Sequence, residues 1–129
     1  MESKPLALII EDDEDLNAIF SSALEKAGYM VKSVYDGAAA QSFLAGIVPA
    51  LILLDLHMPR VGGDVVLKQI RSNDKLKNVG IIIATADARL AQAMQFQSEL
   101  VLLKPIRFSQ LSLLASHFVK KSPIVGAAD

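Results

Sequence analysis

The sequence predicts a doubly wound α/β domain, in which one parallel β-sheet carries helices on both faces. Five short apolar runs recur along the chain, and segments with helical spacing separate them. Most of the runs are continuous rather than alternating, which is typical of strands that are covered on both faces. Strand and helix alternate five times, which favours repeated β-α units. In such a domain, ligands bind at the carboxyl ends of the strands.

The predicted strands are the five apolar runs, each four to six residues long, a common length for a strand. They cover residues 6–10, 30–34, 51–54, 79–84 and 100–103. Each run ends at a polar or turn-forming stretch, so we expect the chain to leave the sheet at these points.

Five further segments have the apolar spacing of amphipathic helices. In the first, residues 16–27, the apolar face includes Ile19, and Gly28 follows where a C-terminal cap belongs. The second, residues 38–45, is rich in alanine, a strong helix former. The others cover residues 65–70, with Val65 on the apolar face, 90–94 and 108–118.

Composition narrows the possible classes of function. The 129 residues are enough for one domain, and the net charge of -1 gives no electrostatic case for binding nucleic acid or anionic lipid. The absence of cysteine excludes disulfides and thiolate metal sites, and it fits a reducing compartment. No apolar stretch approaches the ~20 residues of a membrane span. We therefore expect a cytoplasmic domain that binds neither nucleic acid nor a membrane directly.

Polar residues follow four of the five predicted strands. Glu11 and Asp12 follow the first strand, Asp55 the third, Thr85 the fourth and Lys104 the fifth. Because parallel strands end at the same edge of a sheet, these side chains should converge. Three carboxylates suit Mg²⁺, and a carboxylate can also attack phosphorus as a nucleophile. A metal and a lysine stabilise the charge of a transferred phosphoryl group. The set therefore predicts phosphoryl transfer onto one aspartate.

Other candidate residues have simpler interpretations. Asp13, Glu14 and Asp15 fit an N-cap and an acidic first turn that is favourable to the helix dipole. We expect His57 to lie in a loop beside the site and His117 on a helix surface, because neither has a second histidine at ligand spacing. Any one of the strand-end residues taken alone is also common as a turn residue. The prediction depends on their occurring together.

Four stretches of the chain together resemble the receiver (CheY-like) domain of two-component response regulators. They read LALIIEDDEDL, PALILLDLHMPRVGGDVVLKQIR, IIIATAD and LVLLKPI. The resemblance covers residues 5–119 and implies a flavodoxin-like fold with strand order 2-1-3-4-5 and five helices. It places a receiver domain in residues 1–119, and residues 120–129, which lack periodicity, are expected to form a loose tail or the start of a linker.

The resemblance also implies roles for the carboxylates. Asp55 matches the phosphoacceptor of the family. Asp12 matches the direct Mg²⁺ ligand, and Glu11 matches its water-linked partner. The main-chain carbonyl of His57, rather than its ring, would complete the metal shell.

The same resemblance implies that Thr85 and Lys104 bind the phosphoryl group. The donor would be a phosphohistidine on a sensor histidine kinase or a histidine phosphotransfer protein. The product would act on a downstream protein target that the sequence does not identify. The module would not be an enzyme with a separate substrate, and would at most catalyse its own phosphorylation and dephosphorylation.

The chain departs from the family pattern in several places. Gly62 stands where receivers commonly have aspartate, and Val101 stands where they carry an aromatic residue. The stretch between Thr85 and Lys104 is shorter than usual, and it lacks the Gly-Ala expected before the fifth strand. Most of these departures fall on the fourth helix and fifth strand, the usual output face of the family. We therefore expect intact chemistry and a non-standard read-out.

Two other classes of function remain open. A phosphatase with an aspartyl-phosphate intermediate would resemble Asp-x-Asp at the nucleophile, but here the second position is His57. A binding module that is never phosphorylated would not require the Asp55 and Lys104 that this chain retains.

Overall fold

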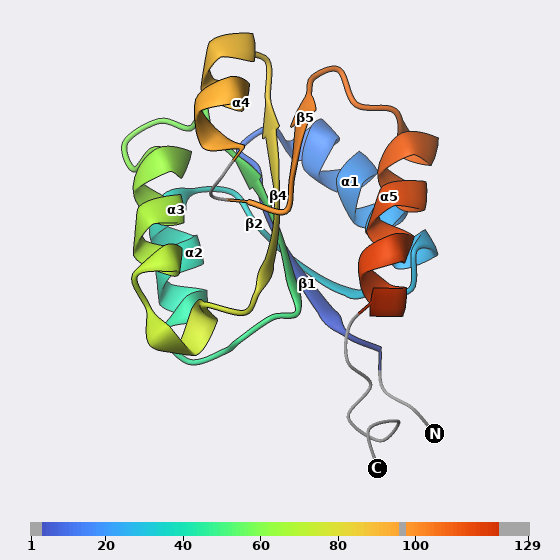
Figure 1. Cartoon of the computed structure of the whole chain (residues 1–129), viewed down its shortest axis with the longest axis horizontal. Helices are drawn as coiled ribbons and strands as arrows, with labels where there is room; N and C mark the ends of the chain where they lie inside the picture. The colour runs from blue at the N-terminus through green and yellow to red at the C-terminus, as the bar shows by residue number, and fades with distance from the viewer. Residues whose placement is uncertain (1–3, 96–97, 122–129) are drawn as a thin grey trace.

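A single five-stranded sheet forms the centre of the molecule (Figure 1). The computed structural model of the chain describes residues 4–95 and 98–121. The strands are β1 (Leu6–Ile10), β2 (Met30–Val34), β3 (Leu51–Asp55), β4 (Gly80–Thr85) and β5 (Leu100–Leu103). All neighbouring strands are parallel and lie in the order β2-β1-β3-β4-β5, so the predicted flavodoxin-like topology is confirmed.

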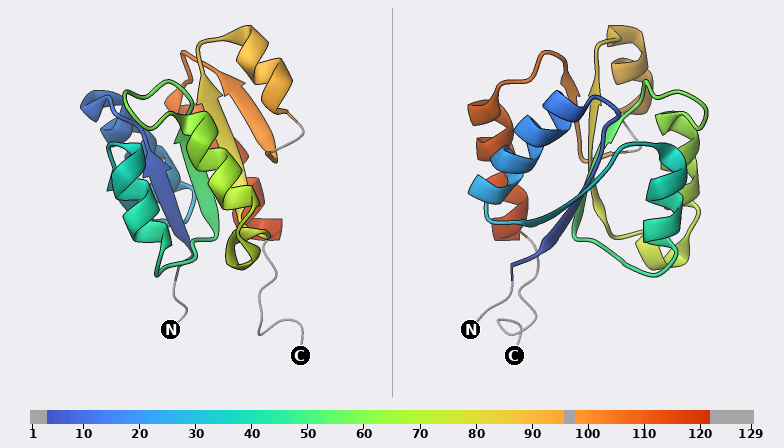
Figure 2. Two further views of the ribbon diagram at one scale, coloured as in Figure 1. Left: turned by 90° about the vertical axis from the view of Figure 1, so that its left-hand side faces the viewer. Right: turned by 180° about the vertical axis from the view of Figure 1, so that it is seen from behind.

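Helices cover both faces of this sheet. They are α1 (Glu14–Lys26), α2 (Gly37–Leu44), α3 (Gly63–Arg71), α4 (Ala88–Met94) and α5 (Phe108–Lys121), with a short 3₁₀ helix η1 (Asp74–Leu76) that the sequence patterns did not predict. α1 and α5 lie on one face, and α2, α3 and α4 lie on the other (Figure 2). Within the described residues, no helix combines the length and the apolar character needed to cross a membrane.

Residues at alternate positions of a strand face opposite helix layers. Ala7 and Ile9 of β1 belong to the core cluster of α1 and α5, whereas Leu8 and Ile10 belong to the cluster of α2 and α3. β3 is buried at every position, because it lies in the middle of the sheet with helices on both sides. This arrangement explains the continuous apolar runs in the sequence.

The acidic segment after β1 begins α1 as predicted. The Asp13 side chain accepts a hydrogen bond from the Leu16 N–H, so Asp13 is the N-cap, and Glu14 and Asp15 form the acidic first turn. The end of α1 is also as predicted. Gly28 adopts a φ of +111°, a conformation that strains other residues, and its N–H donates to the Glu25 carbonyl.

Several predicted boundaries and faces differ from the structure. β3 and β4 each include the polar residue that follows their apolar run, because Asp55 and Thr85 still pair with the neighbouring strand. Ile19 and Val65, both assigned to apolar faces, are 44% exposed, since the buried faces of α1 and α3 are narrower than the apolar patterns. α5 extends to Lys121, past the predicted helix of residues 108–118 and into the tail predicted at residues 120–129. The rest of that tail, residues 122–129, lies outside the described residues.

Candidate functional site

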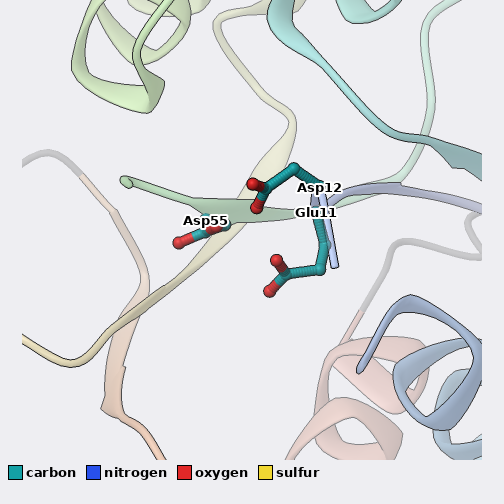
Figure 3. A group of neighbouring side chains, drawn as sticks. All are labelled: Glu11, Asp12 and Asp55. Atoms are coloured by element: carbon teal, nitrogen blue, oxygen red, sulfur yellow. The ribbon is translucent and has the colours of Figure 1, made fainter. Parts of the chain in front are cut away.

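The predicted carboxylates meet at the carboxyl edge of the sheet. Glu11 and Asp12 follow β1, and Asp55 ends β3, the strand directly beside β1. One carboxylate oxygen from each residue lies within 4.8 Å of the other two. Figure 3 shows the three side chains pointing into the same space. Glu11 and Asp55 are only 1% and 3% exposed, whereas Asp12 is exposed.

Lys104 joins this group from β5. Its Nζ lies 2.8 Å from Glu11 Oε1 and 3.4 Å from Asp55 Oδ1. The backbone fixes its place, because the Lys104 N–H donates to the Thr85 carbonyl at 2.8 Å and so continues the pairing of β5 with β4. An ammonium group therefore lies against two buried carboxylates, as the spacing of strand ends predicted.

Burial dominates the electrostatics of the site. It raises the pKa of Glu11 to about 7, although hydrogen bonds from Lys104 and from the Asp13 N–H act in the opposite direction. Burial also raises the pKa of Asp55, against the His57 N–H and the charge of Lys104. For Lys104, burial alone would lower the pKa, but Glu11 and Asp55 together outweigh it and raise the value. One lysine therefore does not offset the cost of burying these carboxylates.

The donor set fits a hard divalent cation. Three carboxylates and one ammonium group leave a formal charge of -2 at the site, which a divalent ion would cancel. Mg²⁺ prefers such oxygen ligands and commonly keeps several waters, which the exposed side of Asp12 leaves room for. Glu11, Asp12 and Asp55 are the residues that would hold it.

The loop after β3 wraps closely around Asp55. The His57 N–H donates to Asp55 Oδ1 at 3.1 Å, and the His57 residue is exposed, in the loop position predicted for it. A Cβ at Gly63 would lie 2.2 Å from the Asp55 carbonyl oxygen, so only glycine fits there. A Cβ at Gly62 would meet only the flexible Asp64 side chain among nearby groups, so this position, unlike Gly63, does not itself require glycine.

Thr85 is fully buried at the end of β4. The residue before it, Ala84, pairs with Asp55 of β3, and the Thr85 carbonyl accepts from the Lys104 N–H. Thr85 Oγ1 accepts a hydrogen bond from the Asp87 N–H at 3.1 Å. The Asp87 side chain in turn accepts from the first backbone N–H groups of α4 and is the N-cap of that helix. The hydroxyl predicted to bind a phosphoryl group is therefore connected directly to the start of α4.

Sequence reasoning missed Asn17. This residue lies on the same helix face as Phe20 and Leu24 and is fully buried. Its Nδ2 donates to the main-chain carbonyls of Glu11 and Val34, at 3.0 and 3.1 Å. A polar residue within an apolar helical stripe was the available signal in the sequence.

Comparison with known proteins places these features in one family. The profile of the response regulator receiver domain matches residues 7–115. The chain is 34% identical over 101 residues to the Regulator of RpoS of Escherichia coli (strain K12), a match that covers 78% of this chain and 30% of that protein. It is 34% identical over 88 residues to the Hybrid signal transduction histidine kinase D of Dictyostelium discoideum, covering 68% of this chain and 6% of that protein.

A solved structure agrees with the sequence matches. The signal receiver domain of a putative Luxo repressor protein from Vibrio parahaemolyticus superposes with a TM-score of 0.85 and 28% identity, over 98% of each chain. The chain spans less than a third of the two curated relatives described above, at 30% and 6% of their lengths.

Proposed function

The chain belongs to the response regulator receiver domain family, and we propose that it accepts a phosphoryl group on Asp55 from a phosphohistidine donor, with Mg²⁺ as cofactor. The observation that carries this proposal is the buried Asp55 carboxylate, which lies 3.4 Å from the Lys104 ammonium and beside the Glu11 and Asp12 carboxylates. These groups support the proposed roles: Asp55 as nucleophile, Lys104 as the cation for the phosphoryl oxygens, and the carboxylates as metal ligands.

The contacts of Asp55 favour one of its oxygens as the nucleophile. The His57 N–H and the Lys104 ammonium both engage Oδ1. We assign the attack on phosphorus to Oδ2. The new O–P bond forms as the P–N bond to the donor imidazole breaks, and the imidazole nitrogen leaves with the electron pair. The transferred group then lies beside the ammonium of Lys104 and the hydroxyl of Thr85.

The cation would be held by Glu11, Asp12 and Asp55, with the His57 carbonyl as the ligand that the family resemblance adds. Bound Mg²⁺ supplies positive charge to the carboxylates and to the phosphoryl oxygens. Glu11 already accepts hydrogen bonds on both carboxylate oxygens, from Lys104 and from the Asp13 N–H. These contacts favour a role for Glu11 through a metal-bound water.

The named relatives indicate the partners of such a module. One relative is named a hybrid signal transduction histidine kinase and another a regulator, so segments similar to this chain occur in proteins of both kinds. We propose a sensor histidine kinase or a histidine phosphotransfer protein as donor, a downstream protein as target, and the cytoplasm as location. The module catalyses at most its own phosphorylation and dephosphorylation.

Acetyl phosphate tests the proposal. With Mg²⁺ present, intact mass spectrometry should detect one phosphoryl group on the chain, and Asp55→Asn should abolish that adduct. Asp36→Asn is the matched control, because Asp36 caps α2 by accepting from the Ala39 N–H and asparagine caps equally well. An equal yield of adduct on Asp55→Asn would refute the assignment. Turnover of a generic phosphate ester would favour the phosphatase alternative, and no reaction would favour a module that is never phosphorylated.

A further inference from the structure

Asn17 is fully buried within the apolar face of α1. Its Nδ2 donates to two carbonyls at once, those of Glu11 and Val34, where β1 and β2 end. Among residues 4–95 and 98–121, its Oδ1 has no hydrogen-bond partner. The orientation of the amide follows from these contacts, because the opposite orientation would point Oδ1 at two other acceptors.

The contact with Glu11 completes the hydrogen bonding of that residue. The Glu11 N–H donates to the Val34 carbonyl at 3.2 Å, and its two carboxylate oxygens accept from Lys104 and from the Asp13 N–H. The Glu11 carbonyl accepts from Asn17. Every polar group of Glu11 therefore has a hydrogen-bond partner. Among these partners, Asn17 is the one whose side chain connects the body of α1 to the end of β1.

The Glu11 carbonyl belongs to the peptide unit that joins Glu11 to Asp12. That unit is planar, so a hydrogen bond that fixes the direction of the carbonyl also fixes the Asp12 nitrogen and the position of the Asp12 Cα. Asp12 is the exposed member of the carboxylate set, whereas Glu11 and Asp55 are buried. The direction of its carboxylate therefore depends on its backbone more than on packing around the side chain.

We propose that Asn17 is a positioning residue for the metal site, which orients the Glu11–Asp12 peptide unit so that the Asp12 carboxylate faces Glu11 and Asp55. This inference rests on the proposed function, since it takes Mg²⁺ to bind at these carboxylates. Residues that orient metal ligands without touching the metal typically change metal affinity by about 10–100-fold when they are removed.

The test compares Asn17→Leu with Tyr29→Phe. Leucine has the same branching at Cγ but lacks the amide donor, and its two methyl groups make it somewhat larger. Tyr29→Phe is the matched control, because it also removes a buried side-chain donor to a carbonyl, that of Ala115, but before β2, at the opposite edge of the sheet. Titration with Mg²⁺ alone, followed by amide chemical shifts below the melting temperature of both variants, should give about 10–100-fold weaker binding for Asn17→Leu. Tyr29→Phe should bind as the unaltered chain does.

A second measurement needs no metal. Hydrogen exchange of the Glu11 amide, which donates to the Val34 carbonyl, should rise in Asn17→Leu by more than the loss of overall stability of that variant predicts, whereas in Tyr29→Phe it should rise only in proportion to that loss. A role limited to overall stability would raise exchange in both variants in proportion to their loss of stability.

The outcomes separate this inference from the proposed function. Equal Mg²⁺ dissociation constants for Asn17→Leu and the unaltered chain would overturn the inference alone. An unaltered chain that does not bind Mg²⁺ would overturn the proposed function and this inference with it. If Asn17→Leu does not fold, the side-chain NH₂ signals of Asn17 in the unaltered chain provide the answer. They should shift with the same Mg²⁺ dissociation constant as the Asp12 amide, and signals indifferent to saturating Mg²⁺ would overturn the proposal.

Discussion

Two neighbouring regions of the molecule differ in how tightly they are packed. The first is the carboxyl ends of β1 and β3, and the second is the side formed by α4 and β5. At the first, Glu11 and Asp55 are buried, and hydrogen bonds or ion pairs engage the backbone and carboxylate of Glu11. At the second, none of the seven residues of α4, all within the described part of the chain, is buried, and Leu103 at the end of β5 is 50% exposed. The carboxylates of the proposed phosphoryl site thus lie on the firmly packed part of the fold, and the segment with least packing lies beside them.

Thr85 connects the two regions. Its position at the end of β4 belongs to the site, and its hydroxyl accepts from the N–H of Asp87, the N-cap of α4. Elements with few buried contacts open and move at the lowest free-energy cost. A change at the phosphoryl site that draws on the Thr85 hydroxyl would therefore act first on the start of α4.

The largest predicted effect is the loss of stability caused by substitutions in the core. Leu54 of β3 is fully buried, so Leu54→Ala should lower the free energy of unfolding by about 3 kcal/mol. Leu90 of α4 is half-buried and packs at the margin of the same core cluster, so Leu90→Ala should cost about 1 kcal/mol. Urea unfolding of both variants measures the difference, and equal losses would contradict the comparison.

We also predict that the stability depends on pH through Tyr29, a buried residue at the edge of the sheet opposite the carboxylates. Burial raises the pKa of Tyr29 from 10.0 to about 12. The pKa of Tyr29 in the folded chain lies above its value in the unfolded chain. The free energy of unfolding therefore keeps its full value below pH 10.0 and falls as the pH rises towards about 12. The loss should be about 1.4 kcal/mol per pH unit in that window.

Tyr29→Phe should remove this alkaline loss. At neutral pH the variant should be less stable by about 1 kcal/mol, because it lacks the hydrogen bond to the Ala115 carbonyl. Urea unfolding at neutral and alkaline pH measures both effects. Tyr35→Phe is the control, since the Tyr35 side chain is already 47% exposed in the folded chain. An alkaline loss of the same size in Tyr29→Phe and the unaltered chain would contradict the assignment.

Much of the fold was predictable because burial on both faces leaves a simple pattern. Three strands, β1, β2 and β5, have the predicted bounds. The errors have local causes. Asp55 and Thr85 are polar but still pair within the sheet, so the apolar runs end one residue early. Ile19 and Val65 match the helical spacing yet are exposed, because periodicity gives a face without giving the width of the layer that covers it.

The site was predictable for a different reason. Parallel strands end at one edge, so polar residues after the apolar runs had to meet there, and Glu11, Asp55 and Lys104 do meet. The position of Asn17 at the site was not predicted, because the sequence does not show which main-chain carbonyls its amide reaches between α1 and the sheet. The need for glycine at position 63 was not predictable from the sequence, because it comes from the close approach of the Asp55 carbonyl in the folded chain.

Metal addition should have a smaller effect than the core substitution. Two carboxylates about 4 Å apart repel by roughly 4 kcal/mol at an effective dielectric constant of about 20, and Mg²⁺ relieves this repulsion. At ten times its dissociation constant, Mg²⁺ should stabilise the fold by about 1.4 kcal/mol, or roughly 3–6 °C in melting temperature. Asp12→Asn should melt higher than the unaltered chain without metal and should lose most of the Mg²⁺ response.

Asp13→Asn sharpens this prediction. Asp13 is the next residue in the chain, but its side chain caps α1, a role that asparagine also fills. This variant should keep the Mg²⁺ response of the unaltered chain. Thermal unfolding with and without Mg²⁺ measures all three proteins, and a melting temperature of the unaltered chain that does not respond to Mg²⁺ would count against a metal site.

The smallest expected effect is the conformational change at β5. Receivers that carry an aromatic residue at the position of Val101 can turn its ring inward when the hydroxyl matching Thr85 moves, and burying a ring contributes about 1.5–3 kcal/mol to that coupling. Val101 has no ring and is stiff about χ1. A different path for the conformational change runs through Asp87. Its N–H donates a hydrogen bond to the Thr85 hydroxyl, and its side chain caps α4. We therefore expect the signal to pass into the start of α4 and to fade along β5.

Amide chemical shifts with and without beryllofluoride, which mimics a phosphoryl group on Asp55, test this expectation. Shifts should concentrate at Asp12, Asp55, Thr85, Asp87 and Lys104, and should decline towards Leu100 and Phe108. Thr85→Val should keep the volume of the side chain but remove the acceptor for the Asp87 N–H, so it should shift the Asp87 signal before beryllofluoride is added. It should also suppress the further change at α4 on addition. Large shifts across β5 and α5 in the unaltered chain would instead show that the module switches fully without an aromatic residue at position 101. In that case, the difference in packing between the carboxylate region and the α4–β5 side would not determine where the chain responds to beryllofluoride.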